Sequence, residues 1–343
     1  MTDAQKKPLI GMTLPELKDT VKALGIPAFK GLQIARWIYA RRATDIAQMT
    51  DLSKKERDVL SAAFTVGRQE PLKQAISSDG TAKYLFPGVG GRDIEAVAIP
   101  EADRLTLCVS SQAGCKMNCA FCMTGRGGWQ GNLDASAIIN QILSVPDSES
   151  LTNVVFMGMG EPLDNLDNVL HAIDILTSDW GLGWSPKRIT VSTVGVNPKG
   201  LHRLLQETKV HIAFSLHNPF PAARAEIMPA ERALSFHDVL QTLREFDFSH
   251  QRRLSIEYIM WRGVNDDMRH CTALARALAG LDCRVNLIRF HAFPGYDGQP
   301  SDKATMENFR DALNARNITA TIRTSRGEDI EAACGQLSGE KKR

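Results

Sequence analysis

The chain has 343 residues, 43% of them hydrophobic and 23% charged, which is typical of a globular protein and excludes disordered, coiled-coil and collagen-like chains. Its 41 Lys and Arg nearly balance 39 Asp and Glu, but residues 1–70 hold 12 basic and 8 acidic side chains, so the front end is mildly basic. No apolar leader follows the opening MTDAQKK, and no window holds the roughly 18 apolar residues of a membrane span. We therefore expect a cytosolic protein that contacts no membrane.

The first 70 residues predict helices. Thr13 to Glu16 has the T-x-x-E pattern of a capping box, and apolar residues then recur at helical spacing until Gly25. A second helix is expected over residues 29–41 and a third over residues 53–60. The basic excess of this segment fits either a solvated surface or a face that binds a polyanion, so nucleic acid stays open on composition alone.

From about residue 73 the pattern changes to strands. Asp79-Gly80 between residues 74–77 and 83–86 is a strong hairpin signal, and residues 93–99 continue with alternating character. Strands then alternate with helices to the end of the chain. The expected strands are 105–109, 154–157, 188–193, 211–216, 254–260, 285–290 and 319–323, and helices between them include 135–143, 166–176, 237–246 and 268–278.

Repeated β-α units predict parallel strands with right-handed crossovers. We expect an α/β fold: a partial (β/α)6 barrel with a small N-terminal helical domain and a β-hairpin extension. The expected parts are a helical accessory domain (1–70), the hairpin extension (71–103), the barrel with its C-terminal segment (104–338) and a polar tail (339–343). Ligands of such barrels bind at the carboxyl ends of the strands.

The cysteines point to metal or redox chemistry. Seven are too few for a disulfide scaffold, and Cys115, Cys119 and Cys122 form a C-x3-C-x2-C motif in the loop after the first barrel strand. A structural zinc site would need a fourth Cys or His, and no His lies near this segment. Three thiolates on a four-iron cluster leave one iron open to chelate a small molecule. We favour the cluster over zinc or three unrelated thiols.

The next strand ends carry ligand-binding residue types. Gly158-Met159-Gly160-Glu161 follows the second barrel strand, where glycines allow close approach and a carboxylate can pair with an ammonium group. Ser192-Thr193 and Ser215-Leu216-His217 end the next two strands, where a ribose or carboxylate could bind. Simple turns and helix N-caps are the alternative interpretation.

Together these motifs resemble the radical S-adenosylmethionine superfamily and, within it, the RlmN/Cfr family of RNA methyltransferases, especially its adenine-C2 branch. The matching stretches are 107–115, 121–125, 132–133, 158–162, 215–217, 263–266, 285–288, 326–330 and 333–337. The resemblance implies one 4Fe-4S cluster on Cys115, Cys119 and Cys122, and two molecules of S-adenosyl-L-methionine per turnover. It also implies 23S rRNA as the substrate, tRNA as a further substrate of relatives, an RNA-binding N-terminal domain, an external flavodoxin-like electron donor and a monomer.

The target atom explains why the family needs further cysteines. Adenine C2 lies between two ring nitrogens and is electron-poor, so it cannot attack the methyl group of S-adenosylmethionine as an amine would. In the family's route, which the resemblance carries over, a cysteine matching Cys334 is methylated first. Cys108 matches the thiol that later forms a transient disulfide with Cys334, and Glu95 matches the carboxylate that accepts the C2 proton. Without the family, both cysteines would be interpreted as buried packing residues and Glu95 as a solvent-facing side chain.

The family's cofactor contacts carry over to matching positions, with one departure. They are Gly160, Glu161, Ser192, Ser215, Leu216, His217 and His291. His291 stands where many relatives have Asn, and it can still donate or accept a hydrogen bond. Cys271 and Cys283 match no catalytic position, and we interpret both as packing residues.

Two other functions remain open from the sequence. Methylation of adenine C8, the resistance-associated branch, would use the same cluster and cysteines, although Pro162 after Gly-Met-Gly-Glu favours C2. A zinc-stabilised RNA-binding module without catalysis is the alternative from another class.

Overall fold

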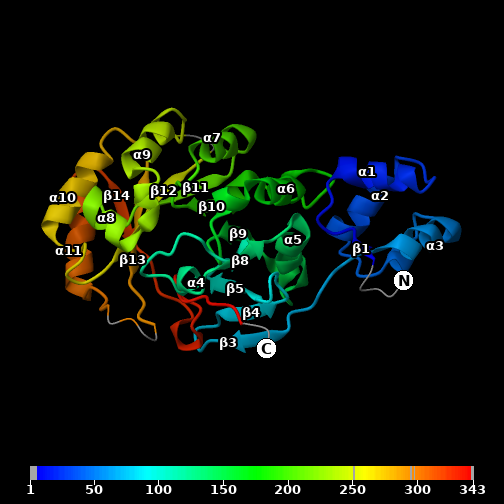
Figure 1. Ribbon diagram of the computed structural model, residues 1–343, viewed down its shortest axis with the longest axis horizontal. Coiled ribbons are helices and arrows are strands. Elements are labelled where there is room, and N and C mark those ends of the chain that lie inside the picture. Colours follow the sequence, from blue (N-terminus) through cyan, green and yellow to red (C-terminus); the bar gives the residue numbers. More distant parts are fainter. Residues whose placement is uncertain (1–5, 250–251, 294–295, 297, 341–343) are drawn as a thin grey trace.

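The computed structural model describes residues 6–249, 252–293, 296 and 298–340. A small helical domain at the N-terminus lies beside a large α/β body (Figure 1). Its elements are α1 (Leu14–Ala23), α2 (Lys30–Ala35), α3 (Lys54–Ala63) and the paired short strands β1 (Lys7–Pro8) and β2 (Phe64–Thr65). Thr13 and Ser53 begin α1 and α3 with capping boxes, as the T-x-x-E pattern predicts for α1.

The helix expected over residues 29–41 is divided. After α2, the residues Arg36–Ala40 form one π-helical turn. This turn places Tyr39 fully inside the domain, where its hydroxyl donates to the carbonyl of Met12 at 2.7 Å and accepts from the amide of Gly11 at 3.1 Å. These hydrogen bonds join the second helix to the chain that precedes α1.

Ten strands form one mixed sheet in the order β14-β13-β12-β11-β10-β9-β6-β5-β4-β3. They are β3 (Lys73–Ile76), β4 (Ala82–Phe86), β5 (Ile94–Glu101), β6 (Arg104–Cys108), β9 (Asn153–Phe156), β10 (Ile189–Thr193), β11 (His211–Ser215), β12 (Leu254–Met260), β13 (Arg284–Arg289) and β14 (Thr319–Ile322). Strands β3 to β6 pair antiparallel, whereas β6 and β9 to β14 run parallel. The predicted hairpin extension is therefore continuous with the barrel sheet.

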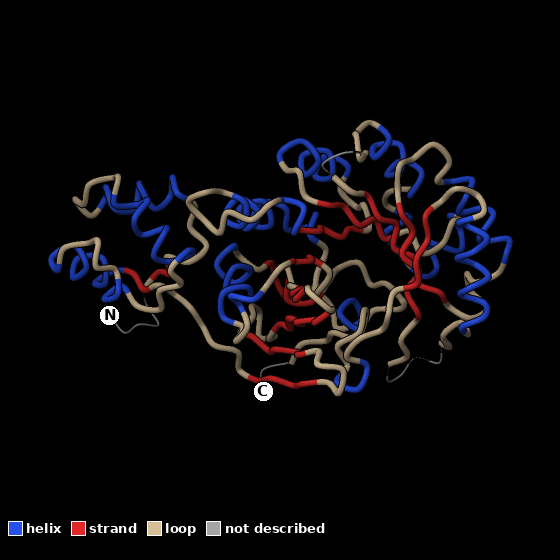
Figure 2. The backbone as a smooth tube through the Cα atoms, turned by 180° about the vertical axis from the view of Figure 1, so that it is seen from behind, coloured by secondary structure: helices blue, strands red, loops and turns tan. Residues whose placement is uncertain are grey.

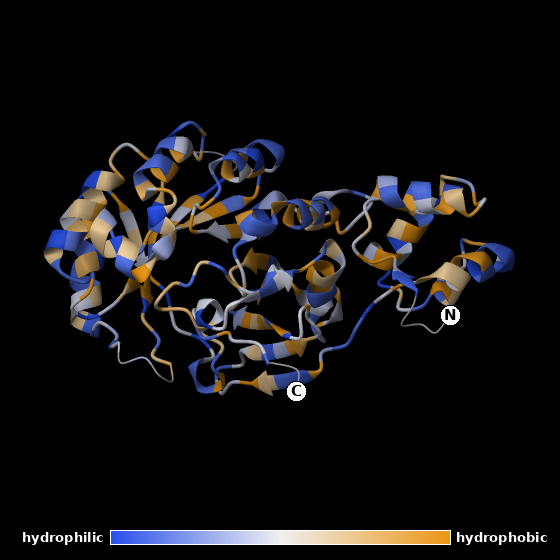
Figure 3. Cartoon of the chain, in the orientation of Figure 1, coloured by the Kyte–Doolittle hydropathy of each residue, from blue (hydrophilic) through white to orange (hydrophobic). Residues whose placement is uncertain are grey.

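Helices connect the parallel strands and cover the outer face of the curved sheet (Figures 1 and 2). They are α5 (Ala135–Ser144), α6 (Leu166–Thr177), α7 (Pro198–Glu207), α8 (Pro221–Ile227), α9 (Phe236–Arg244), α10 (Met268–Ala277) and α11 (Lys303–Asn314). Hydrophobic and hydrophilic residues alternate along these helices (Figure 3), as expected for helices with one buried side. The predicted partial (β/α)6 barrel is confirmed.

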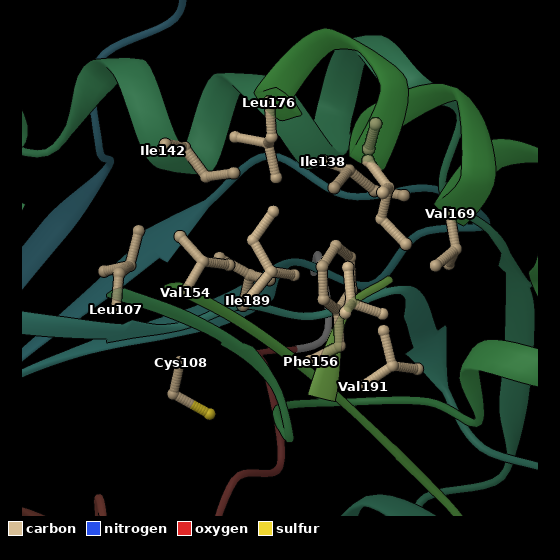
Figure 4. Packing of buried hydrophobic residues seen from close by; sticks show 14 of the residues in the cluster. Leu107, Cys108, Ile138, Ile142, Val154, Phe156, Val169, Leu176, Ile189 and Val191 are labelled. Atoms are coloured by element: carbon tan, nitrogen blue, oxygen red, sulfur yellow. The ribbon is translucent and has the colours of Figure 1, made fainter. Parts of the chain in front are cut away.

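The two faces of the sheet differ in polarity. Leu107, Val154 and Ile189 stand in register on neighbouring strands and pack beneath α5 and α6 (Figure 4). Cys108, the next residue of β6, points away from this core (Figure 4). Polar side chains such as Thr190 line the inner face, which borders a cavity of about 840 Å³. The outer face of the sheet therefore forms the hydrophobic core with the helices, whereas the polar inner face is available for binding and catalysis.

The segment after β2 attaches the N-terminal domain to α5. Arg68 donates to the carbonyls of Leu143 and Arg42, and Gln69 exchanges two hydrogen bonds with Asn140, at 2.8 and 2.9 Å. Among the described residues, every helix is too short or too polar to span a bilayer.

Candidate active site

The three motif cysteines lie in a loop framed by a small hairpin that the sequence analysis did not predict. Strand β7 (Gln112–Gly114) leads into the loop, and helix α4 (Met123–Arg126) and strand β8 (Trp129–Asn132) follow it. Gly114 has a φ of +80°, and a Cβ there would lie 1.8 Å from the carbonyl oxygen of Gly128. This glycine therefore lets β7 and β8 close around the loop.

The loop residues pack into a small apolar cluster, separate from the main core, that includes Phe121, Ile227 and Met228. Cys115 and Cys119 are buried and Cys122 is half-buried. Phe121 meets the His217 ring edge-on at a centroid distance of 4.7 Å, and the amide of Ala120 donates to the carbonyl of Ile227 at 2.9 Å. These contacts fix the loop at the carboxyl ends of β9 to β12, where the barrel architecture predicts a ligand site.

The three thiols affect one another. Burial raises the pKa of Cys115 to about 12 and that of Cys119 well above its ordinary value, and the neighbouring thiols raise both further. No group of three or more His, Cys, Asp or Glu side chains among the described residues could hold a single metal ion. Three soft sulfur donors in one loop fit an iron-sulfur cluster, whose positive charge would favour their thiolate forms.

Glu161 lies beside this loop after β9. Its buried carboxylate accepts hydrogen bonds from the hydroxyl of Thr193 (2.6 Å) and the amides of Val194 (3.0 Å) and Leu163 (3.0 Å). Burial raises the pKa of Glu161 to about 7, although these hydrogen bonds oppose the rise. Gly160, with a φ of +104°, lets the chain pass Gln112, because a Cβ would lie 2.6 Å from the Gln112 side chain.

The end of β11 is held by a buried arginine. Arg224 is fully buried, pairs with Glu231, and donates to the carbonyls of Ser215 and Leu216, each at 2.9 Å. His217 follows with a φ of +57°, and its Nδ1 accepts from the amide of Ile259 at 3.1 Å. Burial lowers the pKa of His217 to about 3, so its ring is neutral near pH 7.

A pocket on the inner face brings together several predicted site residues. Cys108 and Cys334 line it with Cys122, His291 and Arg323. All seven cysteines are free thiols, so Cys108 and Cys334 form no disulfide with each other in this structure. Burial raises the pKa of Cys108 to about 12. Cys334 is exposed as a residue, but the chain packed around its sulfur also raises its pKa, and Arg323 opposes the rise at both thiols.

The remaining predicted site residues lie around this pocket or apart from it. His291 Nε2 lies 3.4 Å from the hydroxyl of Ser325, and Ser192 is a half-buried residue of β10 beside Ala213 of β11. The structure does not bring Glu95 into the pocket: it is absent from the described lining residues and its carboxylate contacts the C-terminal segment instead. Cys271 is fully buried in the main core, and Cys283 packs against that core.

Three further side chains shape the site: the sequence analysis named Thr193 only as a strand-end residue and missed Arg224 and Arg323. Thr193 bonds Glu161, Arg224 holds the end of β11, and Arg323 lies beside the two pocket cysteines. Thr193 lies 32 residues from Glu161, and Arg323 lies more than 200 residues from Cys108, so no local motif reveals these contacts. Arg224 has nearer partners in Ser215, Leu216 and Glu231, but their spacing matches no motif.

The barrel with its three-cysteine loop defines a radical S-adenosylmethionine enzyme, and comparison with known families agrees. The Radical SAM superfamily model matches residues 109–274, and a model of the ribosomal RNA large subunit methyltransferase N-terminal domain matches residues 7–66. A crystal structure of a radical SAM methyltransferase from Sphaerobacter thermophilus is 37% identical, with a TM-score of 0.90 over 96% of this chain and 99% of that one.

Full-length relatives make the assignment more specific. A probable dual-specificity RNA methyltransferase RlmN of Bacteroides fragilis is 54% identical over 98% of this chain and 97% of its own length. The dual-specificity RNA methyltransferase RlmN of Pseudomonas fluorescens is 39% identical over 99% of this chain and 91% of its own length. The chain therefore belongs to the RlmN family of radical SAM RNA methyltransferases. The zinc-stabilised module without catalysis is excluded by this membership.

Proposed function

We propose that this enzyme methylates C2 of a specific adenine in 23S rRNA, in the peptidyl-transferase region, and C2 of an adenine in tRNA. The observation that carries the proposal is the convergence of Cys108 and Cys334, more than 200 residues apart, on one pocket beside Cys122 of the cluster motif. Two thiols at one pocket serve a route in which a protein sulfur, rather than the electron-poor adenine carbon, accepts the methyl group first. Dual-specificity RlmN relatives of nearly equal length support the two RNA substrates.

The residues around the cysteine loop would hold the cofactors. Cys115, Cys119 and Cys122 would bind one 4Fe-4S cluster, and Gly160, Glu161, Ser192, Ser215, Leu216, His217 and His291 would bind S-adenosylmethionine. When bound, one S-adenosylmethionine supplies the methyl group that Cys334 accepts, and a second one, together with the cluster, supplies a carbon radical that removes a hydrogen atom from that S-methyl group. An external flavodoxin-like donor would supply the electron.

The chain's own side chains perform the polar steps. Cys334 loses its proton and its thiolate takes the methyl group, with the positive charge of Arg323 favouring that thiolate. After the methyl carbon has bonded to adenine C2, Glu95 accepts the C2 proton and the unpaired electron of the adduct would pass back to the cluster. The thiolate of Cys108 then attacks the sulfur of Cys334, and the bond between that sulfur and the methylene carbon breaks. The carbon keeps the bonding electron pair and takes up a proton, leaving methylated RNA and a Cys108–Cys334 disulfide that must be reduced before the next cycle.

The N-terminal domain would contribute RNA contacts. The Arg41 guanidinium lies 4.2 Å from the Trp37 ring, Lys30 lies 5.4 Å from the Phe29 ring, and Phe29 is 61% exposed. Aromatic rings interleaved with cations suit stacking on bases and contact with phosphates.

The direct test is an anaerobic reaction of the reconstituted enzyme with isotope-labelled S-adenosylmethionine and protein-free 23S rRNA, followed by nuclease digestion and mass spectrometry. The proposal predicts labelled 2-methyladenosine. Labelled 8-methyladenosine as the sole product would overturn the C2 assignment, and the same digest of tRNA tests the second substrate.

A further inference from the structure

The segment that carries Cys334 is held on two sides. On one side, the amide of Met123 donates to the carbonyl of Gly335 at 2.7 Å, and the hydroxyl of Thr124 donates to that of Leu337 at 2.6 Å. These partners belong to α4, directly after the cluster motif. Beyond its short 3-10 turn (Glu328–Ile330), the described segment has no regular structure, so such contacts determine where Cys334 lies.

On the other side, Glu95 of β5 closes around the end of the same segment. One carboxylate oxygen, Oε2, accepts from the amides of Ser338 and Gly339, both at 2.8 Å, and the other, Oε1, pairs with Lys83 at 3.1 Å. Glu95 is only 6% exposed. Hydrogen bonds to a shielded carboxylate are stronger than those between neutral groups. In Figure 1 the described end of this segment runs beside β3 and β4, and Glu340 pairs with Lys73 of β3 at 2.6 Å.

The fit at Glu95 is specific to this stretch of chain. Gly339 has a φ of +62°, and a Cβ there would lie 2.2 Å from the carbonyl oxygen of Asp93. The amide of Asp93 donates in turn to the carbonyl of Glu340 at 2.9 Å. Because Gly339 is needed for the close approach, its amide can point at Glu95 without displacing β5.

We propose that Glu95 is a positioning residue: it clamps Ser338 and Gly339 and so holds Cys334 in the pocket for its own methylation. This inference rests on the proposed function and adds a role for Glu95 before RNA takes part. In that step the Cys334 thiolate forms a bond to the methyl carbon as the S–CH3 bond of S-adenosylmethionine breaks, giving S-adenosylhomocysteine; the thiol proton has already passed to solvent. The clamp must open before the same carboxylate accepts a proton from adenine, so the two roles alternate.

The test measures Cys334 before any RNA is added. The reconstituted full-length enzyme receives S-adenosylmethionine without RNA, and mass spectrometry follows the methylation of Cys334 with time. In parallel, amide hydrogen exchange reports on the peptide 332–340. The variants are Glu95→Ala and the double variant Glu95→Gln/Lys83→Met, in which the new amide does not face an ammonium group. Lys83→Met alone is the reference for the double variant, because Lys83 also donates to the carbonyl of Glu331 on the same segment at 3.2 Å. The matched control is Glu340→Ala, since Glu340 lies on the same segment but pairs with Lys73 with its side chain 54% exposed.

The clamp predicts about tenfold slower methylation of Cys334 in Glu95→Ala, and faster exchange in 332–340, because two hydrogen bonds to a charged group are lost. A glutamine oxygen still accepts both amides, so the double variant should methylate Cys334 at about the rate of Lys83→Met, yet fail to complete methylation of RNA. Glu340→Ala should resemble wild type in both measurements.

Two results would overturn the clamp. One is wild-type exchange and methylation in Glu95→Ala. The other is a double variant that is as impaired relative to Lys83→Met as Glu95→Ala is relative to wild type, in both measurements. A wild-type enzyme that never methylates Cys334 would instead refute the proposed function. In that case the hydrogen-exchange comparison alone would decide whether Glu95 holds the segment.

Discussion

Cys108 and Cys334 line one pocket, and among the described cations that line it, Arg323 is the one that acts on both thiols. It follows β14, and its guanidinium lies 4.0 Å from Glu257. Burial works to lower the pKa of Arg323, but Glu257 and the two thiols raise it above its ordinary value. The guanidinium therefore stays charged and favours the thiolate form of its neighbours.

Arg323→Gln should make Cys334 less reactive. Removing the positive charge raises the pKa of the thiol further, and each unit of that rise lowers the thiolate fraction about tenfold near pH 8. The rate of alkylation of Cys334 by iodoacetamide, measured by mass spectrometry, checks this. Arg323→Lys keeps the charge and should react at close to the wild-type rate; equal rates for Gln and wild type would contradict the electrostatic role.

Arg224→Met should destabilise the protein by about 3–5 kcal/mol, because it leaves the carboxylate of Glu231 buried without its partner. Urea unfolding with far-UV circular dichroism measures this. Arg203→Met is the control, because the pairs of Arg203 with Asp167 and Glu207 are exposed, and its loss should cost less than about 1 kcal/mol. Similar losses for both variants would contradict the structural role of Arg224.

Among single residues, the sequence predicted those whose role follows from residues close to them in the chain. The motif cysteines and Glu161 were found because their spacing or their place after a strand reveals them. Glu95 shows the limit: its identity was predicted, but its contact with Ser338 and Gly339 depends on chain more than 240 residues away. Whether the predicted residues act as proposed stays a prediction for the experiments above.

Among the elements, the β3–β4 turn is a second anchor for the C-terminal chain. Asp79 accepts from the amides of Thr81 at 2.9 Å and Gly327 at 3.0 Å, and Asp329 accepts from the hydroxyl of Ser77 at 2.5 Å. Burial works to raise the pKa of Asp79, but these hydrogen bonds outweigh it and hold the pKa well below its ordinary value. The Asp-Gly turn thus joins the hairpin to the end of the barrel as well as reversing the chain.

Asp79→Asn should lower the free energy of unfolding by about 1–2 kcal/mol at pH 7, since hydrogen bonds to a charged acceptor become neutral ones. A carboxyl whose pKa is depressed by folding stabilises the folded state at any pH above its ordinary pKa of about 4. That stabilisation is lost as the pH falls from there toward the lower pKa of the folded state. The difference between variant and wild type in urea unfolding should therefore shrink below pH 4. A constant difference from pH 7 to pH 3 would contradict this, and Asp103→Asn in the exposed β5–β6 turn serves as the control.

The parallel strands and their helices could be predicted because each has the length and periodicity of its class. The β7–β8 hairpin could not, because its strands have three and four residues and are rich in glycine and polar side chains. The π-helical turn after α2 was hidden for a different reason: its residues follow the same spacing as an ordinary helix, and only the burial of Tyr39 against the chain before α1 distinguishes it.

Over the whole molecule, the N-terminal domain and the catalytic pocket lie on one chain of contacts through α5. The segment of residues 67–72 fixes the domain to α5, and Ser110, two residues after Cys108, bonds Gln141 of the same helix. The Ser110 amide donates to the Gln141 side chain at 2.9 Å, and the Ser110 carbonyl accepts from it at 3.0 Å. These contacts through α5 would fix the position of an RNA bound to the N-terminal domain relative to β6, the strand that carries Cys108. The expected boundaries at residues 70 and 103 stay predictions.

Phe29→Ala should weaken RNA binding about fivefold to tenfold, as expected when one base loses an aromatic stacking partner. Filter binding or fluorescence anisotropy with a 23S rRNA fragment at fixed salt measures it. Val59→Ala is the control, because Val59 is also an exposed apolar residue of the same domain but has no aromatic ring that could stack on a base. Equal affinities for wild type and Phe29→Ala would exclude Phe29 from the RNA contact.

The measurement that tests the central claim most directly is a trapping experiment on the two pocket cysteines. Cys108→Ala, Cys334→Ala and wild type are each incubated anaerobically with S-adenosylmethionine, reductant and labelled RNA, then resolved on a denaturing gel, and any cross-linked peptide is sequenced by mass spectrometry. The account predicts that Cys108→Ala accumulates a covalent complex joining Cys334 to adenine C2 through one carbon, and that Cys334→Ala gives neither product nor complex. A Cys108→Ala enzyme that turns over freely, or a complex formed without Cys334, would contradict it.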